Sequence, residues 1–168
     1  TTGASNIKGG DLVLQAANGS LGTDSLPLGL QLTGALTARV GQAIYLRGIG
    51  SGSNDGSISI DYIYAPELVK LLAAGGIKDS RSDSEVNLVS GDLTIDAQFI
   101  GTSDNLLEIS LLGKDGSPGL LMVEATGGGI YLEELVGNLN LIQVSASGDV
   151  ILKAAKNILN SSEDTNGA

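Results

Sequence analysis

The amino-acid sequence predicts an all-β protein, and it favours a parallel β-helix of about seven coils. Apolar residues recur at every second position over short segments, which is the pattern of a strand with one buried face. Gly-Asp, Asn-Gly and Gly-Gly pairs separate these segments and supply sharp corners. The hydrophobic fraction is 42% but only 3% of the residues are aromatic. Stacked coils are filled by small aliphatic residues, whereas an antiparallel β-sandwich, the alternative, is expected to have aromatic anchors.

The alternating segments define the predicted strands in chain order. The series opens at 12–16 and closes at 150–154. One segment between them differs, because Pro66 stands near its start and Gly75 at its end, and this combination predicts a short helical turn near 66–74. The same spacing of two predicts the remaining strands, over 28–32, 36–38, 44–46, 58–60, 86–88, 93–97 and 139–141.

Three Gly-Asp pairs each precede an alternating segment that ends in Ala, in the strings GDLVLQA, GDLTIDA and GDVILKA. The carboxylate of such an Asp can accept a backbone N–H and keep a corner closed. We therefore predict a structural role in turns for the residues of these pairs, which are Gly10, Asp11, Gly91, Asp92, Gly148 and Asp149.

The sequence also repeats on a longer scale. Residues 10–78 and 91–159 align as two copies of about 80 residues, and the string IYL occurs once in each copy. The differences in length fall in Gly-, Ser- and Asp-rich stretches that are typical of loops. A repeat whose insertions fall in turns is typical of a stacked solenoid. We predict one solenoid domain over 1–160, followed by a polar tail over 161–168.

The composition argues against several classes of function. The chain has no His and no Cys, which removes the commonest catalytic base, the thiolate nucleophile and nearly every kind of zinc site. The net charge of −10, with Lys and Arg never in a run, repels phosphate groups. We therefore expect no nucleic-acid partner. No stretch approaches the roughly 20 apolar residues of a membrane span, so we expect no membrane insertion.

Charged residues leave two chemical alternatives open. Asp55, Asp79 and Asp83 stand in Gly- or Ser-rich segments and are the candidate Ca²⁺ ligands. A role in solvated loops is the expected one, so we predict no metal site and no cofactor. Adjacent strand residues such as Glu133 and Glu134 point to opposite faces, and we predict no catalytic residues. A carbohydrate-binding or polysaccharide-cleaving β-helix would use one of two sets: the adjacent Glu133 and Glu134, or the group Asp61, Glu67, Lys70, Arg81, Asp83 and Glu85.

Several segments, taken in their order along residues 6–160, resemble the repeats of filamentous-haemagglutinin-type adhesins and related large bacterial exoproteins. The resemblance implies a right-handed parallel β-helix that is exported and forms the shaft of a surface fibre. Neither a secretion-signal domain nor an adhesive tip is recognisable in these residues. The strings that carry the resemblance are Gly19-Ser20-Leu21-Gly22-Thr23, Gly34-Ala35-Leu36-Thr37-Ala38, Ile130-Tyr131-Leu132-Glu133-Glu134 and Gly148-Asp149-Val150-Ile151-Leu152.

We therefore expect a structural, non-enzymatic protein: a shaft or spacer segment of an extracellular or cell-surface fibre, acting in adhesion or in building a matrix. Neighbouring repeats or subunits that stack end to end are the expected partners, together with a host or matrix glycan or protein. The alternatives are a self-assembling extracellular filament subunit and a β-helix that binds or cleaves carbohydrate.

Overall fold

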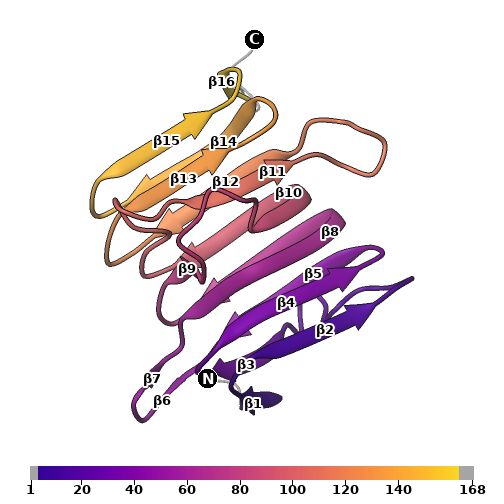
Figure 1. The fold of residues 1–168 in the computed structure, drawn as a ribbon, viewed down its shortest axis with the longest axis vertical. Helices are drawn as coiled ribbons and strands as arrows, with labels where there is room; N and C mark the ends of the chain where they lie inside the picture. The colour runs from indigo at the N-terminus through magenta and orange to yellow at the C-terminus, as the bar shows by residue number, and fades with distance from the viewer. Residues whose placement is uncertain (1–3, 163–168) are drawn as a thin grey trace.

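The strands stack in parallel around one axis. In the computed structural model, which describes residues 4–162, the chain forms a β-solenoid of about six turns, and no helix occurs in that range (Figure 1). Fourteen strands belong to one continuous sheet, and two short strands form a separate pair. The strands are β1 (Ile7–Gly9), β2 (Leu12–Ala16), β3 (Leu28–Leu32), β4 (Ala35–Val40), β5 (Ala43–Gly48), β6 (Gly50–Ser51), β7 (Asn54–Asp55), β8 (Ile58–Ala73), β9 (Ile77–Asp79), β10 (Leu88–Ala97), β11 (Leu107–Leu111), β12 (Leu120–Ala125), β13 (Ile130–Glu134), β14 (Leu139–Ala146), β15 (Val150–Ala154) and β16 (Ile158–Asn160).

Each strand of the large sheet pairs with the strand one coil before or after it. Leu93, for example, lies between Val69 of the previous coil and Leu121 of the next. All pairings between strands of this sheet are parallel. Within the described residues, the antiparallel pairings are those of β6 with β7 and two isolated bridges. The predicted parallel β-helix is therefore confirmed, and the antiparallel sandwich is wrong.

The number of coils is about six instead of the expected seven or so. The number of residues per coil varies more than a regular repeat implies. Leu93 and Leu121 occupy the same position in successive coils but are 121 − 93 = 28 residues apart, because the loops 101–106 and 112–119 lie between them. Residues that pair from one coil to the next form a column, and each step along this column is one turn. The members of the column are Leu21, Ile44, Val69, Leu93, Leu121, Leu141 and Asn160.

The predicted helical turn near 66–74 is wrong, because residues 66–73 belong to the long strand β8. Val69 and Leu71 are fully buried and alternate with more exposed neighbours, as in any strand with one inner face. This segment pairs with β5 on one side and with β10 on the other. Two hydrogen-bonded ladders outweigh the local helix signals at the ends of the segment, since intrinsic propensity is weak beside tertiary pairing.

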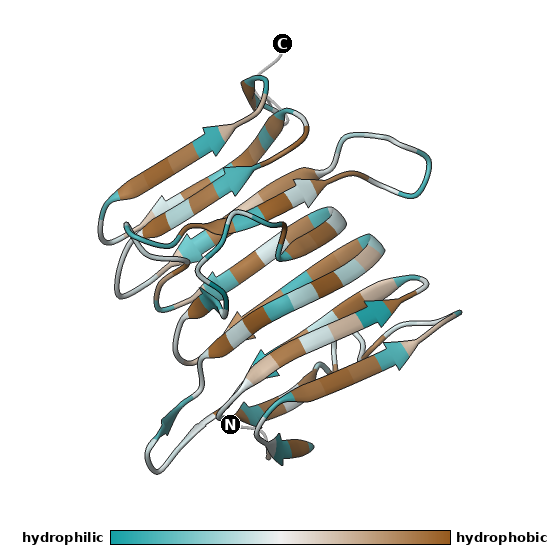
Figure 2. Ribbon diagram, in the orientation of Figure 1, coloured by the Kyte–Doolittle hydropathy of each residue, from teal (hydrophilic) through white to brown (hydrophobic). Residues whose placement is uncertain are grey.

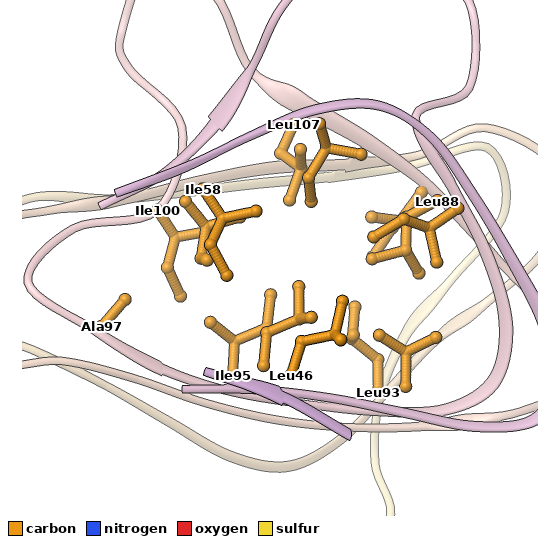
Figure 3. Packing of buried hydrophobic residues seen from close by; sticks show 14 of the residues in the cluster. Leu46, Ile58, Leu88, Leu93, Ile95, Ala97, Ile100 and Leu107 are labelled. Atoms are coloured by element: carbon orange, nitrogen blue, oxygen red, sulfur yellow. The ribbon is translucent and has the colours of Figure 1, made fainter. Parts of the chain in front are cut away.

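The interior is a single aliphatic core that runs along the solenoid axis. Hydropathy alternates along the strands, as the bands in Figure 2 show. Ile44 and Ile130 are both 0% exposed and lie in this common interior. Figure 3 shows how side chains from different sides of the coils point toward one another in this core, among them Leu46, Ile58, Leu88, Leu93, Ile95, Ala97, Ile100 and Leu107.

Local pairings recur between the two halves of the chain. The bridge between Leu21 and Ile44 has a counterpart between Ile100 and Ile130. The register of β4 against β8 shifts after Leu36, and that of β12 against β14 shifts after Leu121. The counterparts lie on different sides of the solenoid, because Ile44 and Ile130 belong to different columns. The two-copy organisation therefore stays a prediction. Within the predicted tail 161–168, residues 163–168 lie outside the described range.

Candidate functional site

The Gly-Asp pairs form hydrogen bonds between successive coils. Gly10-Asp11 and Gly148-Asp149 precede β2 and β15, whereas Gly91-Asp92 lies within β10, where the register against β8 shifts. Asp11 Oδ1 accepts a hydrogen bond from Ala35 N at 2.8 Å, and Asp92 Oδ1 accepts one from Leu120 N at 3.0 Å. Each of these bonds reaches the next coil, whereas a bond within the same corner was expected. The third pair differs, because it is the backbone carbonyl of Asp149 that accepts a hydrogen bond from the adjacent coil. The carboxylates of the first two pairs therefore contribute to the cohesion between coils.

The charged residues considered for a carbohydrate site do not converge as one set. Lys70 Nζ forms an ion pair with Asp24 Oδ1 at 2.5 Å, and Glu67 is an exposed residue of β8. Glu133 faces outward and is partly exposed, whereas Glu134 is 1% exposed. The alternation of β13 thus separates the two adjacent glutamates, as the sequence predicts.

Glu134 serves the corner that follows β13. Its Oε2 accepts a hydrogen bond from Leu111 N of the previous coil at 2.7 Å. Its Oε1 accepts two more, from Val136 N and Gly137 N, at 3.0 Å each. A buried carboxylate that accepts several backbone N–H bonds stabilises a corner whose donors would otherwise lack acceptors. The position of Glu134 is therefore explained by the fold.

The remaining charged residues meet at Arg81, in the loop 80–86 that leaves β9 and returns to β10 (Figure 1). Arg81 Nε lies 3.5 Å from Asp61 Oδ1 and 3.7 Å from Asp83 Oδ2, and Nη1 lies 3.4 Å from Glu85 Oε2. Nη2 donates a hydrogen bond to the carbonyl of Val86 at 3.1 Å. One guanidinium group therefore holds three carboxylates and the end of the loop together.

Three polar side chains are buried at the base of this loop. Asp79 is 8% exposed, Asn87 is 0% exposed and Glu108 of β11 is 4% exposed. Asn87 bridges the other two, because its Nδ2 donates to Asp79 Oδ1 at 2.6 Å and its Oδ1 accepts from Glu108 N at 3.1 Å. Asp79 Oδ1 also accepts from Arg81 N at 2.8 Å, which begins the loop. We call Asp79, Asn87 and Glu108 the loop-base cluster.

Two carboxylate oxygens of the loop-base cluster, Asp79 Oδ2 and Glu108 Oε2, are buried and have no hydrogen-bond partner among the described residues. Burial raises the pKa of Glu108 to about 7, and the negative charges of Asp79, Glu133 and Asp83 contribute to the rise. Glu108 therefore exchanges its proton near neutral pH, unlike an exposed glutamate.

The candidate calcium ligands are divided between two places. Asp55 lies in β7, where its Oδ1 accepts a hydrogen bond from Ser57 N at 2.9 Å. The hydrogen bonds from Ser57 lower the pKa of Asp55. Asp79 and Asp83 lie on either side of Arg81 in the loop region. Over residues 4–162, no three acidic side chains are grouped in a way that could hold a metal ion.

Asn87 and Glu108 were not singled out by any sequence pattern. Glu108 occupies the outward position between Leu107 and Ile109, where alternation predicts an exposed side chain. Its burial depends on tertiary contacts at the loop base, such as the hydrogen bond from its own N–H to Asn87. Ser110, the next outward residue, is also buried. A strand whose outward positions are covered can be recognised only once the neighbouring loop has been placed.

An open depression with a volume of about 640 Å³ lies between residues 66–67 of β8, residues 91–92 of β10 and the loop 113–119. Asp92 lines it, but the carboxylate of Asp92 is engaged by Leu120 N. Asp115 also lines it and accepts a hydrogen bond from the hydroxyl of Ser117 at 2.6 Å. Glu67 is the third carboxylate that lines the depression, and it is exposed, whereas Asp92 and Asp115 both accept hydrogen bonds from the chain.

Two further observations concern the chain as a whole. Within residues 4–162, no helix has the length and apolarity that crossing a bilayer requires. Comparison of the chain with protein-family models, with curated proteins and with solved structures gives no match.

Proposed function

We propose that this chain is a spacer segment of an extracellular or cell-surface fibre, built by stacking coil upon coil. The observation that supports this function is the aliphatic interior, which continues from coil to coil and whose core-facing side chains are partly exposed at the last described coil. Hydrogen-bonded parallel ladders join each coil to the next along the whole described length. A solenoid of this kind is stabilised mainly by contacts between neighbouring coils, so its length can grow without a new core.

The last coil presents an apolar surface at its open end. Val150 pairs with Ile130, and Ile158 pairs with Leu139, so both continue columns whose earlier members are fully buried. Val150 is nevertheless 45% exposed and Ile158 is 48% exposed. Among residues 4–162, β15 and β16 each have a strand partner on one side only, and apolar side chains beside such an edge favour the addition of a further strand.

The first coil presents the complementary edge. Among the described residues, β1 and β2 have strand partners on one side only. Leu12 and Leu14 of β2 are partly buried and pack on the core. A second copy placed end to end would therefore extend both the ladders and the aliphatic interior. The extracellular setting, and a role in adhesion or in a matrix, are supported by the resemblance to filamentous-haemagglutinin-type repeats.

The association of the chain with itself tests this function. We expect sedimentation velocity at increasing concentration to show oligomers, and electron microscopy to show short rods. Val150→Lys places a charge on the core-facing side of the last coil and is expected to weaken association at least tenfold, by roughly 1.4 kcal/mol or more. Ile151→Lys is the matched control, because Ile151 lies on the same strand, is 39% exposed and faces outward.

The control variant is expected to associate as the unsubstituted chain does. A chain that stays monomeric at every concentration, or equal losses of association in the two variants, would show that the open end is not a stacking surface.

A further inference from the structure

We propose that copies of this chain stack in one register, in which Leu152 of one copy lies on Leu12 of the next and Ala154 lies on Leu14. The register rests on the proposed spacer function and specifies which residues meet at the junction. Within residues 4–162, β1 and β2 form the edge of the first coil, and β15 and β16 form the edge of the last one (Figure 1). Columns of paired residues run between the two edges and determine the register.

One column joins Leu14 in the first coil to Ala154 in the last. Every step of this column is a parallel pairing between neighbouring coils, so its members share one place in the cross-section of the solenoid. A further coil that continues the ladders places its own member of the column on Ala154. When that coil is the first coil of a second copy, the member is Leu14. The members of the column are Leu14, Ala38, Ile63, Leu88, Ile109, Glu134 and Ala154.

A second column on the same side of the solenoid gives the same register. It begins at Ile58 and ends at Val150. Ile58 stands two residues before Ile60, whose own column ends at Leu12 in the first coil. Val150 therefore lies in line with the residue two before Leu12, which is Gly10. The offset between the first and the last coil is the same in both columns, since 154 − 14 = 140 and 150 − 10 = 140. The members between Ile58 and Val150 are Ile77, Ile100 and Ile130.

On the opposite side, the short end strands fit into one level without overlap. β1 precedes β2 by half a coil and β16 follows β15 by half a coil, so pairing β2 with β15 brings β1 of the next copy to the level of β16. β16 ends at Asn160, which lies in the column of Ile44. β1 begins at Ile7, which pairs with Leu30, and Leu30 pairs with Gly48, four residues beyond Ile44. Three positions therefore remain between the two strands, 48 − 44 − 1 = 3.

Alignment of the Gly-Asp pairs gives a competing register, in which Gly148-Asp149 lies on Gly10-Asp11. Its offset is 148 − 10 = 138, and a difference of two residues keeps the alternation of inward and outward side chains. The competing register places the carboxylates of Asp149 and Asp11 opposite each other, and like charges so placed destabilise a sheet.

The competing register also breaks a column on the opposite side of the solenoid. With the offset of 140, the column that counts the turns passes from Asn160 to Leu21 of the next copy. A shift by two residues on one side moves the opposite side by two residues as well, so Asn160 and Leu21 no longer share a column. The offset of 140 is therefore the one that joins the columns on both sides.

Cross-linking across the junction tests the register. Val13 is 74% exposed, Lys153 is also exposed, and the two meet in the proposed register because 153 − 13 = 140. Val13→Cys and Lys153→Cys are prepared as separate variants and mixed, at a concentration at which sedimentation shows oligomers of the unsubstituted chain. We expect a disulfide between position 13 of one copy and position 153 of another, because parallel neighbours lie about 4.8 Å apart.

The matched control is Gln15→Cys mixed with Lys153→Cys, the pair that meets in the competing register, 153 − 15 = 138. Gln15 is exposed on the same strand as Val13. In the proposed register its Cα lies roughly 8 Å from that of Lys153, too far for a disulfide, so we expect at least about tenfold less cross-linking. Non-reducing electrophoresis and peptide mapping compare the two mixtures.

The outcomes separate the register from the spacer function. Cross-linking through position 15 in place of position 13 would assign the competing register. Oligomers in which neither mixture cross-links would overturn the proposed register and leave association in place. A chain that stays monomeric would overturn the spacer function, and the register with it. Asp11→Cys mixed with Ile151→Cys has the same offset, 151 − 11 = 140, and keeps the test decisive if a variant of the first pair folds poorly.

Discussion

Replacing Ile95 by Asp is expected to unfold the chain under conditions in which the unsubstituted chain is folded. Ile95 is 1% exposed, and it lies between Leu71 of the previous coil and Val123 of the next. A carboxyl group without a partner at this depth costs about 5 kcal/mol. That loss is comparable to the whole stability of many domains, which is about 5 to 15 kcal/mol. Neighbouring coils are expected to be lost as well, since each is stabilised by its contact with the next.

Thr94→Asp is the matched control for Ile95→Asp. Thr94 is the preceding residue, is partly exposed and pairs with Lys70 of the neighbouring coil. A new carboxylate there stays in water beside a lysine, so we expect the free energy of unfolding to change by less than about 0.5 kcal/mol. Circular dichroism and urea unfolding compare the two variants. Equal midpoints would mean that Ile95 does not face the interior.

Gly101→Ala is expected to lower the free energy of unfolding by about 3 kcal/mol. Gly101 has a φ angle of 62°, in the left-handed region that residues with a Cβ rarely adopt. A Cβ at this position would lie 2.3 Å from the carbonyl oxygen of Tyr131 in the next coil. Because that oxygen belongs to backbone, relief requires the coils themselves to move apart. Gly22 has the same conformation and the same kind of contact, 2.6 Å to Tyr45 O, and we expect a similar loss there.

Gly52→Ala separates the two causes of this loss. Gly52 has a φ angle of 61°, nearly that of Gly101, but no atom lies within 4 Å of a Cβ built on it. The conformational cost alone remains, and it is about 1 kcal/mol. Urea unfolding of both variants then gives the contribution of close packing between coils by difference. Equal losses would contradict a tight approach of the coils at Gly101.

Alternation of apolar residues predicted the strands best where it directly reflects burial. The segments 12–16 and 150–154 coincide with β2 and β15. The inward residues Leu12, Leu14 and Ala16 of β2, and Leu152 and Ala154 of β15, pack on the core, while the alternate residues are exposed. A side-chain period of two arises only in extended backbone, so such segments have no competing interpretation.

Alternation failed where both faces of a strand are covered or where apolar residues are continuous. In β11, all of the residues Leu107–Leu111 are buried, including a glutamate and a serine. In β12, a run of four apolar residues, 120–123, hides which ones face inward. The stretch 66–74 failed for another reason, because Pro66 and Gly75 at its ends are typical of a helix and its partners in β5 and β10 are distant in the sequence. The pairing partners decide these cases, and they come from other coils.

The loop-base cluster could not be predicted from the sequence either, because it too depends on contacts between coils. Asp79 was among the considered calcium ligands, because acidic residues gather in 79–85. Glu108 lies 29 residues further along, 108 − 79 = 29, in a different coil. No local spacing connects the two, since their proximity depends on the length of the intervening coil. The charge of a residue can be read from the sequence, whereas its burial depends on what is folded over it.

The parallel stacking of coils is tested most directly by disulfide formation between outward-facing positions, because the chain has no cysteine of its own. Tyr45 is paired with Lys70, and Arg47 with Leu72. Parallel neighbours lie about 4.8 Å apart, which is compatible with a disulfide. We expect the double variants Tyr45→Cys/Lys70→Cys and Arg47→Cys/Leu72→Cys both to cross-link. Cross-linking of the first pair together with Arg47→Cys/Leu68→Cys, and not with Arg47→Cys/Leu72→Cys, would show antiparallel strands and contradict the solenoid.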